Sequence, residues 1–205
     1  PNIEKSFIVI NNIISLNNTK PLIDLYNQVM GVKVYQRGKG KPKQTIFELE
    51  NNVFISFVRN DTFQFPFISQ GIKRYFYETQ NEFINYGEWL AEPRDLDYFI
   101  NPKIVIREII NPTIYATYVE DDAVVKNIAA VITEKTPKYP LKYLLALINS
   151  KLINYYVNQQ SPKSSNKSYP SFNSKLLKNI PIKECDFNTQ NILIKKADTM
   201  LLLNK

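Results

Sequence analysis

The chain has 205 residues, a length that predicts one domain with room for two lobes. Hydrophobic residues make up 44% of it, enough to fill a core, and the formal net charge of +7 suggests a polyanionic partner without proving one. The absence of histidine excludes an imidazole base or ligand. The single cysteine, Cys185, excludes an internal disulfide and a multi-cysteine zinc site.

Membrane and secretion signals are missing from the sequence. No apolar run approaches the roughly 20 residues of a membrane span, and no signal peptide is visible. We therefore expect a cytoplasmic protein without a membrane partner. The chain starts at Pro1 instead of a methionine, and its last segment resembles the opening of a helix, so we expect a piece of a longer polypeptide.

The first 60 residues are predicted to mix strands with a helix. Apolar runs within residues 1–16 predict a first strand against the core. The apolar spacing in residues 22–30 predicts a short amphipathic helix that ends at Gly31, the position of a C-cap glycine. Residues 46–50 and 53–58 predict two strands joined by a tight asparagine turn.

Residues 32–45, VKVYQRGKGKPKQT, predict a mobile basic loop, because glycine and proline disfavour regular structure. One interpretation is an arm that follows phosphates and touches bases with Tyr35, Gln36 and Gln44. A solvated hairpin loop is equally compatible. The glycine spacing and the following helix of a nucleotide P-loop are absent. The segment contains no acid and five cations: Lys33, Arg37, Lys39, Lys41 and Lys43.

Residues 86–109 hold the only tryptophan, Trp89, within a polar and turn-prone segment. That segment leads into the β-branched run 104–109, which predicts a core strand. A loop that carries tryptophan, glutamate and Arg94 on a rigid strand is a common way to present recognition groups. Trp89 itself has two interpretations, a base contact or a core anchor.

Two further pairs of cations also allow two interpretations each. Lys73 and Arg74 stand beside two tyrosines and either contact a nucleic-acid backbone or form a basic pair on a strand edge, which is slightly favoured. Lys163 and Lys167 lie in the acid-free segment 161–169, which is either a solvated linker or a phosphate contact.

The second half of the chain has a more regular pattern. Residues 113–119 and 123–132 predict two strands that continue the preceding one into an antiparallel meander. Residues 141–157 are apolar almost all round and predict a buried helix. A short helix is predicted over residues 174–180, and a new amphipathic helix over 189–203.

These elements together predict an α+β fold. Its centre is a twisted, mainly antiparallel sheet with packed helices, two basic loops at one edge, and the start of a longer helix at the end. We expect one domain over residues 1–188, followed by the start of a longer helix within residues 189–205.

The sequence contains no convincing catalytic set. Asp95 and Asp97 are close together but lack a lysine at the offset of a nuclease site; with Glu108 they leave a small metal-dependent nuclease as one alternative. Neither Asn-Pro pair is followed by the proline and aromatic residue of an amino-methyltransferase, and no glycine-rich loop suits S-adenosylmethionine. The residues favour a binding module, and a protein-interaction module with solubilising loops is a third hypothesis.

An ordered series of short motifs resembles the TaqI-like C-terminal specificity domain. This is the target recognition domain of type IIG restriction-modification enzymes and related adenine methyltransferases. The resemblance covers nearly the whole chain from about residue 20, and its specificity lies in the order of the motifs. They are GVKVYQRGKG at 31–40, GIKRY at 71–75, YGEWLAEPR at 86–94, PKIVIR at 102–107, LKYLLALINSKL at 141–152, YP at 169–170 and LKNIPI at 177–182.

The resemblance implies a non-catalytic lobe that grips double-stranded DNA opposite an upstream methyltransferase domain of the same chain. That domain would bind S-adenosylmethionine and flip an adenine from the helix, and the parent enzyme would also use Mg²⁺. The resemblance makes residues 1–188 a DNA target recognition domain and residues 189–205 the start of a C-terminal spacer or docking helix. This last helix resembles the start of the spacer helix in type I specificity subunits, which keeps half of such a subunit as an alternative.

The expected DNA contacts are of two kinds: phosphate contacts, which grip the duplex, and base contacts, which read its sequence. Lysines on a glycine-rich loop suit phosphates, whereas Gln36, Arg37, Gln44, Trp89 and Arg94 suit base edges in the major groove. The full expected set is Lys33, Tyr35, Gln36, Arg37, Lys39, Lys41, Lys43, Gln44, Lys73, Arg74, Trp89, Arg94, Lys163 and Lys167.

Overall fold

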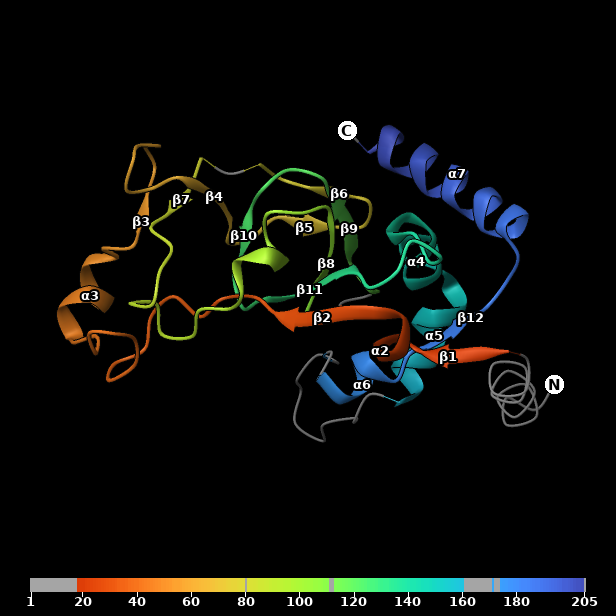
Figure 1. Ribbon diagram of the computed structural model, residues 1–205, viewed down its shortest axis with the longest axis horizontal. Coiled ribbons are helices and arrows are strands. Elements are labelled where there is room, and N and C mark those ends of the chain that lie inside the picture. The colour runs from red at the N-terminus through yellow and green to blue at the C-terminus, as the bar shows by residue number, and fades with distance from the viewer. Residues whose placement is uncertain (1–17, 80, 111–112, 161–170, 172–173, 205) are drawn as a thin grey trace.

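A four-stranded antiparallel sheet lies at the centre of the computed structural model, which describes residues 18–79, 81–110, 113–160, 171 and 174–204 (Figure 1). The strands in spatial order are β2 (Tyr26–Met30), β11 (Ala129–Glu134), β8 (Lys103–Arg107) and β9 (Ala116–Val119). Val105 of β8 pairs with Val131 of β11 on one side and with Thr117 of β9 on the other.

This sheet separates two hydrophobic cores, because alternate residues of a strand face opposite sides. On β8, Ile104 and Ile106 belong to one buried cluster, and Val105 belongs to the other. The residues of β11 alternate between the two clusters in the same way. Burial of both faces explains why the sequence of β8 is an unbroken β-branched run.

Helices cover one face of the sheet and form what we call the helical layer (Figure 1). Its helix α4 packs against β9 and against the long terminal helix α7. The strands β1 (Thr19–Pro21) and β12 (Pro181–Lys183) pair antiparallel beside it. The layer consists of α2 (Leu22–Leu25), α4 (Leu141–Ile148), α5 (Lys151–Gln160), α6 (Ser174–Lys178) and α7 (Phe187–Leu203).

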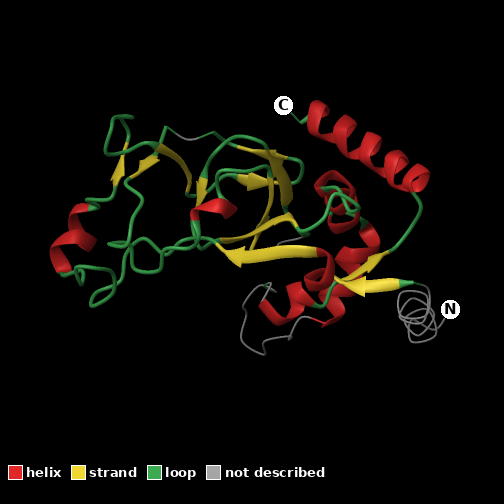
Figure 2. Ribbon diagram, viewed as in Figure 1, coloured by secondary structure: helices red, strands yellow, loops and turns green. Residues whose placement is uncertain are grey.

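The second core continues into a loop-rich lobe, at the left of Figures 1 and 2, which we call the distal lobe. A small sheet in the order β10-β4-β7-β3 supports it, in which β10 and β4 pair in parallel. The hairpin β5 (Ile72–Lys73) and β6 (Phe76–Tyr77) packs instead against the central sheet. The remaining elements are α3 (Ile46–Asn51), β3 (Ile55–Ser56), β4 (Phe65–Ile68), β7 (Phe83–Ile84), the 3₁₀ helix η1 (Leu96–Tyr98) and β10 (Val124–Val125).

The predicted helix over residues 22–30 is wrong beyond Leu25. The backbone becomes extended at Tyr26, with φ −136° and ψ 151°, and β2 then pairs with β11. Pairing with a strand about 100 residues away outweighs a weak local helical pattern, because intrinsic helix propensities differ by less than about 1 kcal/mol per residue.

The predicted strand over residues 46–50 is also wrong, because these residues form helix α3. Thr45 caps the helix: its hydroxyl accepts a hydrogen bond from the nitrogen of Phe47, and the Glu48 carboxylate accepts one from the nitrogen of Thr45. Asn52 ends the helix in the left-handed conformation, with φ +49°. Of the predicted strand over 53–58, only β3 forms.

Two predicted elements are each divided in the structure, one of them where the sequence predicted a break. The helix over residues 141–157 breaks at Asn149, whose side-chain amide donates to the carbonyl of Ala116 at 2.9 Å, and Leu152 after the break is exposed. The strand over 123–132, which the sequence predicts to be broken by Lys126 and Asn127, is interrupted there and becomes β10 and β11, which join different sheets.

The α+β fold with a mainly antiparallel sheet and a long final helix is confirmed. The predicted first strand within residues 1–16 lies outside the described residues. None of the helices described is both long enough and apolar enough to cross a membrane.

Candidate nucleic-acid interface

The basic loop, residues 32–45, is a closed structure docked on residues 85–94, the segment after β7 that we call the platform. The sequence predicted a mobile arm instead. The nitrogen of Lys33 donates to the carbonyl of Glu92 at 3.2 Å, and the nitrogen of Glu92 donates back at 2.9 Å. Further along, the nitrogen of Lys41 donates to the carbonyl of Glu88 at 2.8 Å. The loop is therefore fixed to its platform at both of these positions.

Gln44 holds the loop together from inside. Its side chain is buried, and the amide nitrogen donates to the carbonyls of Val34 and Trp89, both at 2.8 Å. The amide oxygen accepts from the nitrogen of Gln36 at 2.9 Å. The structure thus gives Gln44 an internal role in place of the predicted base contact, because its hydrogen-bonding groups are occupied and covered.

Two glycines allow the loop and its platform to approach closely. A Cβ atom on Gly40, which has φ +83°, would lie 2.2 Å from the carbonyl oxygen of Trp89. A Cβ on Gly87 would lie 2.4 Å from the indole ring of the same tryptophan. A side chain at Gly40 would push the loop away from the segment that carries Trp89, and a side chain at Gly87 would displace the indole ring within that segment.

The loop presents its cations to solvent. Lys41 approaches the Glu88 carboxylate at 3.6 Å, but both side chains are more than three quarters exposed, so this pair holds the lysine only weakly. Lys33 differs, because it is half-buried and donates to the side-chain oxygen of Gln36 at 2.7 Å. The exposed cations are Arg37, Lys39, Lys41 and Lys43.

The aromatic residues of the expected set serve the fold. The Trp89 indole nitrogen donates to the carbonyl of Asn85 at 3.0 Å, and its ring packs against the core of the distal lobe, which favours the core-anchor interpretation. The Tyr35 ring stacks on Phe54 with centroids 5.5 Å apart, and its hydroxyl accepts from the nitrogen of Phe54. Burial raises the pKa of Tyr35 to about 12.

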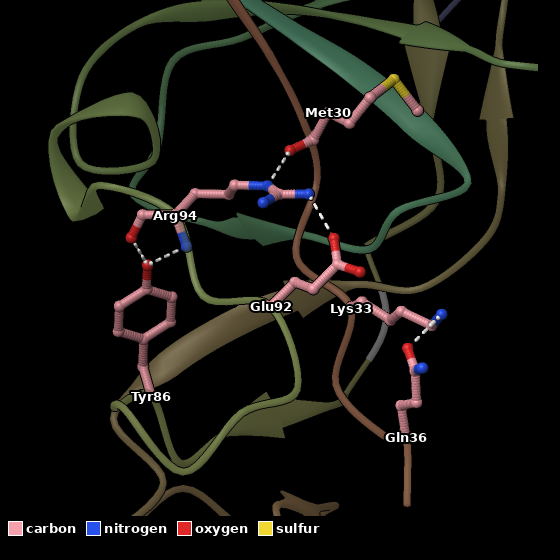
Figure 3. A network of polar contacts seen from close by, with 6 residues as sticks. All are labelled: Met30, Lys33, Gln36, Tyr86, Glu92 and Arg94. Atoms are coloured by element: carbon pink, nitrogen blue, oxygen red, sulfur yellow. Dashed lines mark hydrogen bonds and ion pairs between the residues drawn. The ribbon is translucent and has the colours of Figure 1, made fainter. Parts of the chain in front are cut away.

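Arg94 lies at the centre of a polar network (Figure 3). Its Nε donates to the carbonyl of Met30 at 3.1 Å, and its Nη2 pairs with the carboxylate of Glu92 at 2.9 Å. The hydroxyl of Tyr86 contacts both the nitrogen and the carbonyl oxygen of Arg94. The guanidinium thus joins the platform to the end of β2, a structural role that the sequence pattern did not predict.

The cations of the β5–β6 hairpin are also engaged within the protein. Lys73 pairs with Glu78 at 2.5 Å, and the Nη2 of Arg74 donates to the carbonyl of Asn149 at 2.6 Å. The following Tyr75 has φ +59°, a left-handed conformation stabilised by burial of its ring and by a bond from its nitrogen to the carbonyl of Ala116. The structure therefore does not bring Lys73 and Arg74 together with the basic loop.

Lys103 is a buried cation that sequence reasoning missed. Its ammonium donates to the carbonyls of Phe99, Asn101 and Asp121 at 2.8, 2.9 and 2.8 Å, which joins η1 to the turn between β9 and β10. Burial lowers the pKa of Lys103 to about 8, although Asp122 and Asp121 oppose the shift. The sequence signal was a lysine set directly before an unbroken apolar strand.

One of the acidic residues considered for a nuclease site has a structural role. The Asp95 carboxylate accepts from the nitrogen of Asp97 at 3.1 Å and so caps η1. Within the described ranges, no three His, Cys, Asp or Glu side chains are grouped so that they could hold a metal ion. Lys163 and Lys167 lie outside those ranges.

Four exposed cations on a loop that is hydrogen-bonded to its platform give this α+β scaffold a local positive charge, which favours a polyanionic partner. Residues 67–182, more than half of the chain, match the family described as the TaqI-like C-terminal specificity domain. The chain belongs to this family. It is a specificity domain, the module that recognises DNA sequence in restriction-modification proteins. No curated protein matches the sequence.

Solved structures from restriction-modification systems share the fold. The type IIG restriction endonuclease BpuSI is similar with a TM-score of 0.62 and 11% identity, over 93% of this chain and 28% of the other. The HsdS subunit from Thermoanaerobacter tengcongensis has a TM-score of 0.51 and 11% identity, over 98% and 44%. A chain from a study of complex assembly and conformational transition in a type I restriction-modification system has a TM-score of 0.55 and 12% identity, over 98% of this chain and 45% of the other. This chain therefore spans less than half of each.

Proposed function

We propose that this specificity domain grips duplex DNA with the exposed cations of the basic loop and holds it for an upstream adenine methyltransferase domain of the same chain. S-adenosylmethionine and Mg²⁺ are then cofactors of the parent enzyme and not of this domain. The observation that carries the proposal is the set of four solvated cations on a loop that is fixed to its platform.

A fixed loop suits this task because binding then costs little conformational entropy. Phosphates repeat along the duplex with the same charge, so exposed lysines such as Lys39 and Lys43 can grip DNA of any sequence. Reading needs a group with paired donors. Among the base readers expected from the sequence, Arg37 has an exposed side chain and a guanidinium that fits the guanine edge in the major groove.

The grip is tested by the salt dependence of duplex binding. The double variant Lys39→Ala/Lys43→Ala should lower the slope of log K against log salt by about 1.8, because each lost phosphate contact removes about 0.9. The matched control is Lys195→Ala/Lys196→Ala, which removes the same charge from the exposed surface of α7. Equal slopes for the two double variants would contradict the proposal.

Reading by Arg37 is tested by selecting bound duplexes from a random pool. Arg37→Ala should relax the preference at one base position, worth about 1–3 kcal/mol, whereas Lys39→Ala should weaken all duplexes alike. If both variants weaken all duplexes alike, then Arg37 grips and does not read.

Half of a type I specificity subunit is a second context, favoured by the two type I structures that cover 98% of this chain. The upstream sequence of the parent chain separates the two contexts. An Asn-Pro-Pro-aromatic motif there supports a methyltransferase in the same chain, and a second specificity domain supports a type I subunit.

A nuclease fragment is the competing enzyme hypothesis. Incubation of the chain with duplex DNA, Mg²⁺ and labelled S-adenosylmethionine tests it directly. We expect neither cleavage nor label transfer, and either result would overturn the assignment of this chain as a recognition module alone.

A further inference from the structure

A cavity of about 310 Å³ lies between the edge strand β2, helix α6 and Arg94. Its wall includes Gln28 and Met30 from β2 and Leu177 and Lys178 from α6. The residues described around it contribute two cations and no acid. Its volume is at the lower end of the range for ligand sites, which suits a small polar group.

The arginine at this cavity is already oriented. Its Nε and Nη2 are held by the carbonyl of Met30 and the carboxylate of Glu92, and its side chain is 27% exposed. Within the described part of the chain, no hydrogen bond occupies its second terminal nitrogen, Nη1, and Figure 3 shows the two bonds that hold Nε and Nη2. Glu92 offsets part of the charge of Arg94, so the net positive charge comes from Lys178.

We propose that this cavity binds a phosphodiester group of the DNA backbone. This contact is separate from the basic loop, and the inference rests on the function proposed above. Arg94 supplies a fixed donor and Lys178 a mobile charge, the two kinds of group that proteins use for phosphate oxygens. The apolar side chains of Met30 and Leu177 also line the cavity and limit solvent around Arg94, which strengthens its contact, whereas Lys178 is exposed to solvent.

The position of the cavity agrees with a DNA ligand. In Figure 1, α6 and the basic loop both lie on the lower side of the view. A duplex running along that side would contact both. The cavity would then fix the register of the duplex without reading its sequence, because phosphates carry no base information.

Helix α6 offers a matched pair of variants. Lys178 lines the cavity, whereas Lys175 is an exposed lysine of the same helix that does not line it. With the full chain and a random duplex, Lys178→Gln should lower the slope of log K against log salt by about 0.9, and Lys175→Gln should leave it unchanged. Between 50 and 200 mM salt, the wild type should therefore lose about threefold more affinity than Lys178→Gln.

Free phosphate is the other source of the same chemistry, so a second arm titrates the chain with inorganic phosphate and follows amide resonances of β2 and α6. Equal slopes for the two lysine variants would overturn the DNA assignment. Phosphate-dependent shifts together with equal slopes would assign the cavity to free phosphate instead. A wild-type chain that binds no duplex would overturn the proposed function, and the phosphate titration would then decide whether the cavity binds phosphate.

Discussion

At the scale of the single residue, Gln44 fixes the shape of the basic loop. Its buried amide makes three hydrogen bonds to main-chain groups. Gln44→Ala should lower the free energy of unfolding by about 1–3 kcal/mol, because the amide and carbonyl partners lose their bonds in a site that water reaches poorly. Urea unfolding measures the loss.

Gln36→Ala is the matched control for this prediction. The side chain of Gln36 is half-buried and accepts from Lys33, so its removal should cost less than about 0.5 kcal/mol. The same variants separate structure from reading. If Gln44 shapes the loop, Gln44→Ala weakens preferred and scrambled duplexes alike; a loss confined to the preferred duplex would show that Gln44 reads bases.

Lys103 predicts an unusual dependence of stability on pH. Its pKa is lowered from 10.5 to about 8 on folding, so the unfolded chain binds more protons between these two values. Lys103 alone should therefore make the free energy of unfolding rise by about 2 kcal/mol from pH 8 to pH 10. The buried Tyr26 and Tyr143, whose pKa values are raised, oppose this rise once the tyrosines of the unfolded chain begin to ionise at about pH 9, so the contribution of Lys103 is measured against a variant that lacks it.

Lys103→Met isolates this contribution. The variant is expected to be less stable throughout, because three buried carbonyls lose their donor. The difference in free energy of unfolding between the wild type and the variant should also grow by about 2 kcal/mol from pH 8 to pH 10. Parallel pH profiles for the two proteins, measured by urea unfolding at each pH, would rule out Lys103 as the source of the rise.

At the scale of the element, α4 should carry much of the stability of the helical layer. Ile148 is fully buried near its end, and Ile148→Ala should lower the free energy of unfolding by about 2–5 kcal/mol. Leu152 follows the break and is 45% exposed, so Leu152→Ala should cost less than Ile148→Ala by at least about 1 kcal/mol. Equal losses in urea unfolding would mean that the helix is peripheral or that the break closes in solution.

Sequence patterns predicted best those elements whose conformation is determined by residues close together in the sequence. The β-branched run of β8 and the apolar helix α4 are examples. Helix α3 was predictable too, because Thr45 and Glu48 have the spacing of a capping box, a signal that the alternating apolar residues obscured. The break at Asn149 was not, because its cause is a bond to Ala116, 33 residues away.

The residues of the candidate site also differ in whether their positions depend on neighbours in sequence or on distant contacts. Exposure of Arg37, Lys39 and Lys43 follows from their charge and from the glycines between them. The burial of Gln44 and the fixed guanidinium of Arg94 depend on Trp89 and Met30, which are 45 and 64 residues away, respectively, so composition and spacing held no information about them.

At the scale of the whole molecule, the two cores should unfold together, because β8 and β11 contribute to both. We expect one thermal transition whose calorimetric and van't Hoff enthalpies agree. Leu90→Ala, in the core on the side of the distal lobe, and Ile148→Ala, in the core under the helical layer, should each lower the midpoint temperature of that single transition. Two transitions, each moved by one variant, would show that the lobes are independent.

The alternation along β8 also has a consequence for engineering and for divergence. Val105 packs only in the core on the side of the distal lobe, whereas Ile104 and Ile106 pack only in the core under the helical layer. Substitutions at every second position of the central strands can therefore repack the core of the distal lobe while the other positions, and the helices packed on them, stay unchanged. Such a domain can change the surface that supports its basic loop, and so its DNA target, without changes in the helical layer.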